Sequence, residues 1–145
     1  MNVKDIHIGD WLRLRYHRGE KEIVVDFKVT EIVLFAKRTY HIYGEKADGT
    51  QSNMGDVNDI EPIPLTPEIL EKNGFGYIDK SNSTPQSIWN GWWIYKDLEL
   101  GVCSIDRTQN WPCFINIDDA NIKCEYVHQL QNALNICKID KEIIL

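Results

Sequence analysis

The first part of the chain alternates apolar and polar residues with a period of two. Leu12, Leu14 and Tyr16 share one face of a predicted β-strand, and Arg13 and Arg15 share the other face. Such alternation is typical of an antiparallel strand with one buried and one solvated face. We therefore expect antiparallel sheet in this part of the chain.

The strand pattern continues as far as Ile60. A longer strand is predicted over residues 22–35, where the parity of the apolar positions changes near Thr30 and Glu31 and indicates a bulge or a break. Another strand is expected at 38–45, and a last short strand runs into Ile60. Several short antiparallel strands in succession predict a small barrel or roll.

The opening motif, Ile-Gly-Asp-Trp-Leu at 8–12, is followed by a glycine-turn hairpin and resembles SH3-like barrels. The resemblance covers the first part of the chain, so residues 1–61 are expected to form an SH3-like β-barrel or roll. Barrels of this type bind peptides, nucleic acids or nothing at all, so the resemblance does not fix a function.

A short helix with signals at both ends is predicted over residues 67–73. Thr66 is a favourable N-cap residue, and Pro67 falls at the first helical position, where its missing N–H costs nothing. Gly74 suits the left-handed residue that ends a helix. A helix this short is unstable alone, so Leu70 is expected to dock it onto the rest of the fold.

The remaining residues predict a second sheet followed by a helix. The last helix is expected over 125–137, with Val127, Leu130, Leu134 and Cys137 along one apolar stripe. The other predicted elements are strands at 77–80, 88–95, 98–105 and 113–117, a turn at 118–121 and a final strand at 139–145.

Together these patterns predict an α+β fold in three parts. The parts are an SH3-like β-barrel (1–61), a connecting capped helix (62–75) and an antiparallel sheet covered by a C-terminal helix (76–145). An alternative is that all three form one compact unit.

Composition and charge narrow the choice of partners. The 145 residues are 43% hydrophobic and 26% charged, as in an ordinary globular protein. A net charge of -6 argues against nucleic acid or an anionic membrane as the partner. We find no signal peptide and no membrane-spanning apolar run, so a cytoplasmic protein with reduced cysteines is expected.

Residues able to carry out chemistry are present, but none lies in a recognisable signature. Cys124 and His128 are four residues apart, which is a single pair and weak support for zinc. Cys103 or Cys113, followed by His128 and Asn132, follows the order of papain-like sites without their local motif. We therefore predict no catalytic residue, no metal ligand and no cofactor, and leave open whether these cysteines, Cys137 or His128 have a chemical role.

The most unusual feature is a cluster of aromatic residues. In the predicted strand, Trp92 and Ile94 face one way, whereas Trp93 and Tyr95 face the other. One row is expected in the core, and the other is a candidate wall for a partner protein or a flat ligand, together with Trp111. Core packing against the helix is the favoured interpretation.

Basic residues offer a second, weaker candidate site. Arg13 and Arg15, with Arg18, Lys37 and Arg38, can gather on the outer face of the predicted barrel and bind phosphate groups. A solvated face balanced by nearby acidic residues is favoured over this phosphate site.

Two motifs carry a further resemblance. Residues 61–75 read Glu-Pro-Ile-Pro-Leu-Thr-Pro-Glu-Ile-Leu-Glu-Lys-Asn-Gly-Phe, and residues 126–134 read Tyr-Val-His-Gln-Leu-Gln-Asn-Ala-Leu. In that order they resemble a group of small uncharacterised proteins encoded in Bacteroidetes genomes and, commonly, in their phages and prophages. The group implies no activity or functional residue for this chain, but a phage setting favours an interaction or counter-defence role over metabolism.

The leading functional prediction is a non-enzymatic binding protein, associated with a phage or prophage, that acts through protein contacts. The partner is another protein or a second subunit, so a homo-oligomer is one expectation. The alternative is a binder of a small phosphorylated or nucleotide-like ligand that uses the aromatic residues and arginines. An enzyme is the third alternative.

Overall fold

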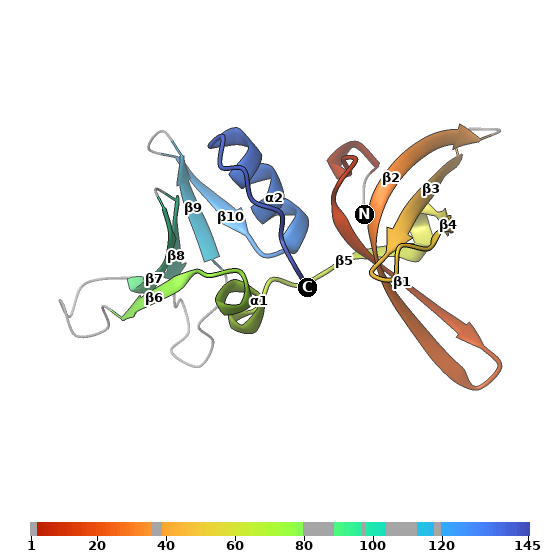
Figure 1. Cartoon of the computed structure of the whole chain (residues 1–145), viewed down its shortest axis with the longest axis horizontal. Coiled ribbons are helices and arrows are strands. Elements are labelled where there is room, and N and C mark those ends of the chain that lie inside the picture. Colours follow the sequence, from red (N-terminus) through yellow and green to blue (C-terminus); the bar gives the residue numbers. More distant parts are fainter. Residues whose placement is uncertain (1–2, 36–38, 80–88, 97, 104–112, 118–119) are drawn as a thin grey trace. The chain divides into compact units, whose positions relative to one another are not determined.

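The structure is a computed structural model that describes residues 3–35, 39–79, 89–96, 98–103, 113–117 and 120–145 (Figure 1). The chain divides into two compact units, residues 1–63 and 64–145. Each unit holds a five-stranded antiparallel sheet, and the described α-helices both belong to the second unit. The fold is therefore α+β.

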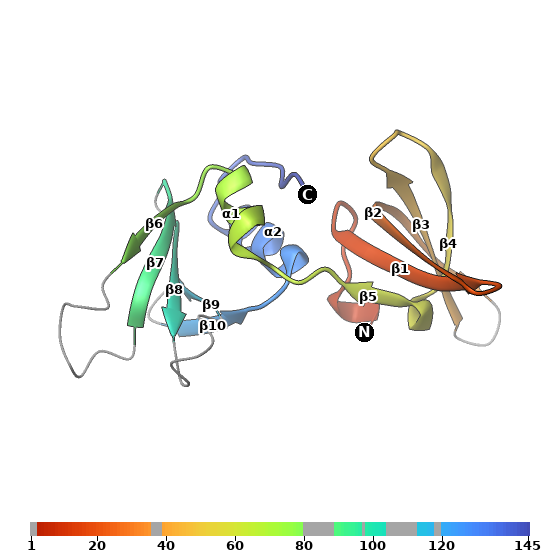
Figure 2. The ribbon, with the colours of Figure 1, turned by 90° about the horizontal axis from the view of Figure 1, so that it is seen from below.

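The first unit is an antiparallel meander with the strand order β4-β3-β2-β1-β5 (Figure 2). Its elements are η1 (Val3–Asp5), β1 (Trp11–Arg18), β2 (Lys21–Phe35), β3 (Thr39–Lys46), β4 (Gln51–Asp56), η3 (Val57–Asp59) and β5 (Ile60–Pro62).

Alternation along β1 and β2 builds the core of the first unit. Leu12 pairs with Phe27 across the two strands, and both side chains are fully buried. The register shifts between Val29 and Glu31, so the bulge predicted from the change of parity is confirmed. The core contains Ile6, Leu12, Phe27, Val29, Ile42, Met54 and Ile60.

The predicted SH3-like barrel is not supported, because the sheet does not close. The edge strands β4 and β5 are not hydrogen-bonded to each other in the described residues. After β4 the chain enters the 3₁₀ helix η3, where Asp56 accepts a hydrogen bond from the amide of Asn58. Only three residues of β5 follow, and they pair with β1 rather than with β4.

The capped helix α1 (Pro67–Lys72) lies where its end signals predicted it. Thr66 Oγ1 accepts from the amide of Ile69 at 3.4 Å, and Gly74 adopts a φ of 78° just beyond the helix. Leu70 is fully buried. The helix belongs to the second unit, where the amide of Leu65 donates to the carbonyl of Glu125 at 2.8 Å.

The sheet of the second unit has the order β10-β9-β8-β7-β6, and α1 and α2 lie on one side of it (Figures 1 and 2). Its strands are β6 (Gly76–Asp79), β7 (Trp89–Tyr95), β8 (Leu98–Cys103), β9 (Cys113–Ile117) and β10 (Ala120–Cys124). β10 was not predicted, because its first two residues were assigned to a turn at 118–121.

The helix α2 (Val127–Ile136) covers the sheet with a wider buried face than the sequence predicted. Leu130 and Leu134 are fully buried as expected, but His128 and Gln131 are buried as well. Cys137 is exposed, contrary to its place on the predicted stripe, because it lies at the C-cap, after the last helical turn.

The predicted final strand at 139–145 is absent. This segment is extended and buries Ile143, but it pairs with a side chain instead of with a neighbouring strand. The amide of Ile144 donates to Asn73 Oδ1 at 2.9 Å, and Asn73 Nδ2 donates to the carbonyl of Ile144 at 2.8 Å.

Candidate interaction surface

The β1–β2 hairpin extends past the ends of its neighbouring strands (Figure 1). β2 pairs with β3 only from Phe27 onward, and β1 pairs with β5 only from Leu12 to Leu14. Residues 15–26 therefore form a two-stranded arm, which we call the β1–β2 arm. Gly19, with a φ of 67°, opens its two-residue turn, as a type II′ turn requires.

The concave face of this arm is apolar and only partly covered. Cross-strand partners share a face, so Tyr16 lies beside Ile23, and Leu14 beside Val25. Tyr16 is 42% exposed. A two-stranded ribbon alone is marginally stable in water, so an uncovered apolar face on one is a candidate for contact with a partner.

An open groove of about 750 Å³, which we call the arm groove, lies against this face. Its lining combines apolar side chains with the charged residues Arg15, Lys46 and Asp59, and neither Lys46 nor Asp59 has an ion pair among the described residues. Its size is in the range of sites that bind ligands or peptide side chains. The groove is lined by Leu14, Arg15, Tyr16, Val25, Lys46, Ser52, Met54, Gly55 and Asp59.

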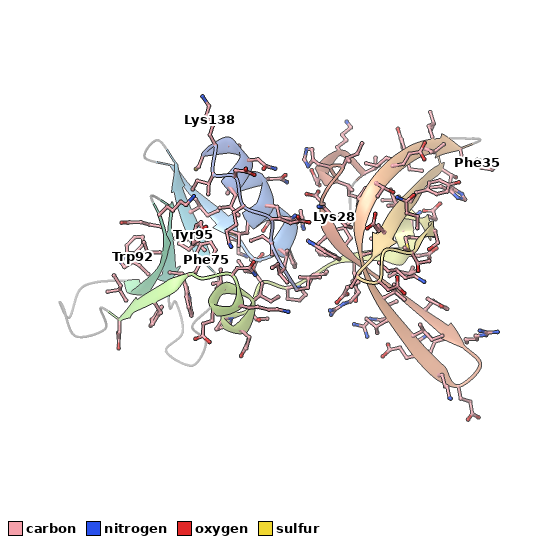
Figure 3. All side chains as sticks on the ribbon, viewed as in Figure 1. Lys28, Phe35, Phe75, Trp92, Tyr95 and Lys138 are labelled. Carbon is pink, nitrogen blue, oxygen red and sulfur yellow. The ribbon has the colours of Figure 1, made fainter. Side chains whose placement is uncertain are left out.

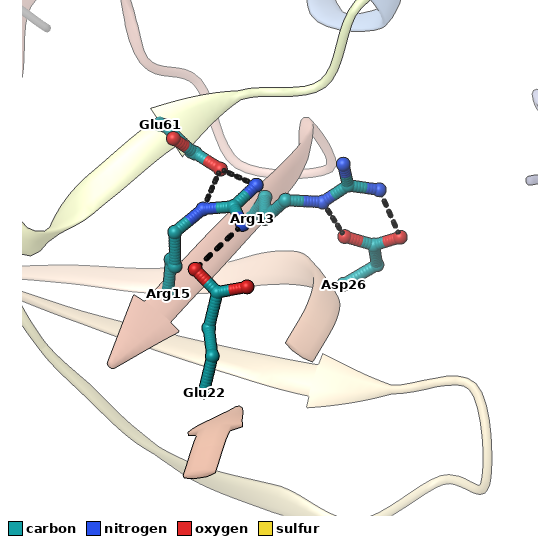
Figure 4. A network of polar contacts seen from close by, with 5 residues as sticks. All are labelled: Arg13, Arg15, Glu22, Asp26 and Glu61. Carbon is teal, nitrogen blue, oxygen red and sulfur yellow. Dashed lines mark hydrogen bonds and ion pairs between the residues drawn. The ribbon is translucent and has the colours of Figure 1, made fainter. Parts of the chain in front are cut away.

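The opposite face of the arm is a network of ion pairs (Figure 4). Arg13 donates to both carboxylate oxygens of Asp26, at 2.6 and 2.8 Å. Arg15 donates to Glu22 at 2.9 Å and to Glu61 at 3.0 Å. The two arginines predicted as phosphate ligands are thus engaged by carboxylates of the same unit.

These contacts also shift the ionisation of the groups involved. The hydrogen bond to Asp26 raises the pKa of Arg13, and hydrogen bonds to Glu22 and Glu61 raise the pKa of Arg15. The hydrogen bond from Arg15 lowers the pKa of Glu22. A phosphate would have to displace carboxylates that already satisfy both guanidinium groups.

The aromatic residues of the second unit separate onto the two faces of the sheet, as their alternation predicted. Trp93 is 6% exposed, and its ring lies 4.9 Å from that of Tyr77. Phe75 and Tyr95 lie together on that face, with ring centroids 5.2 Å apart, and Trp92 lies on the other face (Figure 3). Trp93 therefore belongs to the core.

Two of the predicted aromatic site residues are left near the surface. Trp92 is half-buried on the outer face of the sheet, opposite Ile78, which is 47% exposed. Tyr95 is half-buried too, with the ammonium groups of Lys141 and Lys96 at 4.8 and 5.6 Å from its ring centroid. Trp111 lies outside the described residues.

Of the cysteine and histidine candidates, the structure describes the side chains of Cys124, Cys137 and His128, and no metal-binding group of three includes them there. Cys124 is fully buried, and burial raises the pKa of its thiol to about 12, so it is not a thiolate nucleophile at neutral pH. His128 is buried with its ring stacked on Tyr126 at 5.8 Å. Cys103 and Cys113 fall in β8 and β9, and their side chains lie outside the described part of the structure.

Sequence reasoning singled out Arg15 but missed the other residues of the arm groove as a site. Tyr16 was placed only on a strand face together with Leu12 and Leu14, and no role was given to Lys46 or Asp59. The length difference between the predicted strand at 22–35 and its neighbour at 38–45 was the available signal, because a longer strand must extend past a shorter partner.

No group of three or more metal-binding side chains occurs in the described ranges, and no helix there is long and apolar enough to cross a bilayer. Comparison with models of protein families, with curated proteins and with solved structures finds no match to this chain.

Proposed function

We propose that this chain is a non-enzymatic binding protein that acts by contact with another protein. The observation that carries the proposal is the arm groove, an open concavity whose lining joins apolar side chains to Lys46 and Asp59, two charged residues with no ion pair within the described part of the chain. Apolar floors with a few polar groups at the edge are typical of recognition sites. The earlier resemblance to phage-encoded proteins is in keeping with an interaction role.

The alternative, a binder of phosphorylated small molecules, has less support. Arg13 and Arg15 already have carboxylate partners, so a phosphate could bind either guanidinium group only by displacing a carboxylate. Two cations line the groove: Arg15, which is paired with Glu22 and Glu61, and Lys46. The groove also contains the carboxylate of Asp59, which repels a phosphate.

The proposal is tested by selecting a displayed library of random linear peptides on the purified full chain. Enriched peptides are expected to bind about tenfold more weakly to Tyr16→Ala, which removes an aromatic anchor from the groove floor. Val24→Ala is the matched control. Val24 is 44% exposed on the same arm but on the opposite face, so this change should leave affinity within about twofold.

Failure to enrich any peptide, or equal binding to wild type and Tyr16→Ala, would contradict the proposal. Thermal unfolding of both variants checks that each is folded at the temperature of the binding measurement. A titration with inorganic phosphate or ATP tests the alternative, because a ligand that binds the native state raises its melting temperature.

A further inference from the structure

One edge of β2 is open along the β1–β2 arm. Residues 21–26 pair with β1 on one side, while β3 begins its pairing only at Phe27, opposite Lys46. Among the described residues of this unit, no strand pairs with the other side of residues 21–26. Six residues of a strand span about 20 Å, which is the length of a typical strand.

The direction of the backbone groups on this edge follows from neighbouring hydrogen bonds. The amide of Val29 donates to the carbonyl of Asp10 at 2.9 Å, and its carbonyl accepts from the amide of Gly9 at 2.8 Å. Odd-numbered residues of β2 therefore direct their backbone groups toward β1. Alternation then directs the N–H and C=O groups of Glu22, Val24 and Asp26 to the open edge.

The residues of the open edge are suited to strand pairing. The central residues, Ile23, Val24 and Val25, are β-branched and favour extended structure. Many proteins shorten, bend or cover such an edge to prevent association. Here the edge is long and its middle is apolar, so it is a template for another strand.

The residues that line the arm groove favour particular side chains on an added strand. Alternate side chains of an added strand would point to the concave face, over Val25 and Tyr16. Lys46 lies at the end of β3, next to this position. Lys46 has no ion pair in the described part of the chain, so its ammonium group can contact an acidic side chain of the added strand.

We propose that an extended segment of a partner protein adds as a strand to the open edge of β2, in line with β3. Its alternate apolar side chains enter the arm groove, and an acidic side chain contacts Lys46. This inference rests on the proposed function and specifies its binding mode, since strand addition combines backbone hydrogen bonds for affinity with side-chain pockets for selectivity.

A second copy of the chain fits the same edge less well. An antiparallel pairing of two copies that keeps both concave faces on one side must centre on Ile23 or on Val24. Centring on Val24 places Glu22 opposite Asp26 of the second copy, and like charges opposite each other are destabilising. Centring on Ile23 places the carboxylate of Glu22 opposite the apolar side chain of Val24 of the second copy.

The test compares four forms of the full chain: wild type, Val24→Pro, Val24→Ala and Lys46→Glu. Val24→Pro removes one outward N–H without removing a hydrogen bond to β1, and proline is tolerated at such edge positions. Val24→Ala is the matched control, because it keeps the N–H. Peptides enriched on wild type are expected to bind Val24→Pro about tenfold more weakly and Val24→Ala within about twofold. Lys46→Glu is expected to remove the preference for an acidic residue in the enriched peptides.

The results of these measurements distinguish strand addition from the more general proposal that the chain binds another protein. Peptides that lose affinity for Tyr16→Ala but bind Val24→Pro as well as Val24→Ala would overturn strand addition and leave the proposed function standing. Failure to enrich any peptide would overturn both. A dimer in sedimentation that Val24→Pro converts to monomer would overturn the heterologous partner in favour of a second copy.

A second measurement does not depend on the folding of any variant. The tightest enriched peptide is synthesised with single N-methyl groups at each position in turn and titrated against wild-type protein. Strand addition predicts loss of affinity at every second position, because alternate amides face β2. Losses without a period of two would overturn the proposed binding mode.

Discussion

Two glycines, one in each sheet, lie directly beneath an aromatic ring. A Cβ atom at Gly44 would overlap with the ring of Phe27 and lie 3.0 Å from the carbonyl oxygen of Lys28. A Cβ atom at Gly91 would overlap with the ring of Tyr77 and lie 2.7 Å from the carbonyl oxygen of Ile78. In both units the missing side chain lets a ring lie against the backbone of a neighbouring strand.

Gly44→Ala is expected to destabilise the first unit by about 1–3 kcal/mol, because the added methyl group must displace the fully buried ring of Phe27. Urea unfolding measures the change. Gly76→Ala is the control, since no atom lies within 4 Å of a Cβ atom there. Its free energy of unfolding should stay the same or rise by about 0.4–1 kcal/mol. Equal effects of the two substitutions would contradict the packing argument.

Cys124 and Cys137 are expected to differ strongly in reactivity. Burial raises the pKa of Cys124 from 9.0 to about 12, so its thiolate fraction near neutral pH falls by about a thousandfold. Cys137 is exposed. Iodoacetamide at mildly alkaline pH should label Cys137 first, as read by peptide mass spectrometry, and label Cys124 only in denaturant. Comparable labelling of both in the native protein would show that Cys124 is accessible.

The raised pKa of Cys124 also makes the free energy of unfolding depend on pH. Between pH 9.0 and about 12 the thiol of Cys124 ionises in the unfolded chain but stays protonated in the folded one. The unfolded state then binds fewer protons, so the free energy of unfolding contributed by Cys124 falls as the pH rises through this window.

At the scale of elements, the side chain of Asn73 makes most of the hydrogen bonds that join the end of α1 to residues 144–145. Asn73 is 2% exposed, and its amide group bonds the carbonyl of Ile69 and both backbone groups of Ile144. Lys72 donates to the carbonyl of Leu145 beside it. The C-cap of a two-turn helix thus fixes a segment that is seventy-one residues distant in sequence.

Asn73→Ala should leave the amide and carbonyl of Ile144 without their partner, and a buried group that loses its hydrogen bond costs about 1–3 kcal/mol. Hydrogen exchange should show the amide of Ile144 losing its protection. Asn135→Ala is the control, because Asn135 is exposed on α2 and alanine favours helix. Retained protection at Ile144 in Asn73→Ala would mean that other contacts hold the tail.

Elements with local signals were the ones that the sequence allowed us to predict. Thr66, Pro67 and Gly74 define both ends of α1 within nine residues, and the change of parity at Thr30 defines the bulge. Partners that are far apart in sequence carry no such signal. Glu61 bonds Arg15 across forty-six residues, and closure of the first sheet depends on whether its two edges meet.

For the candidate surface too, sequence patterns predicted local features but not the contacts between elements. Alternation predicted that Trp92 and Trp93 face opposite ways, but it does not say which face the helices cover. The structure buries Trp93, because α1 and α2 lie on that side of the sheet. The open edge of β2 depends on where β3 stops, and a sequence pattern locates strand ends only to within a few residues.

At the scale of the whole molecule, the two units have separate cores. The core of the first includes Leu12, Phe27 and Ile42, and buried residues of the second include Leu70, Trp93 and Leu130. The units divide between Ile63 and Pro64, so α1 belongs to the second unit rather than forming a connector between the two. Separate cores predict that each unit can lose its structure without the other.

Leu70→Asp tests this expectation, because it places a charge at a fully buried position of the second unit. An unpaired buried charge costs more than about 4 kcal/mol, which is a large part of the stability of a small domain. Hydrogen exchange read by mass spectrometry should show lost protection in peptides from 64–145, while peptides from β1 to β5 stay protected. Ile136→Asp is the control, since Ile136 is 65% exposed on α2, and it should change protection little. Equal loss of protection in both units would show that the chain folds as one cooperative body, and the arm groove would then depend on the second unit for its stability.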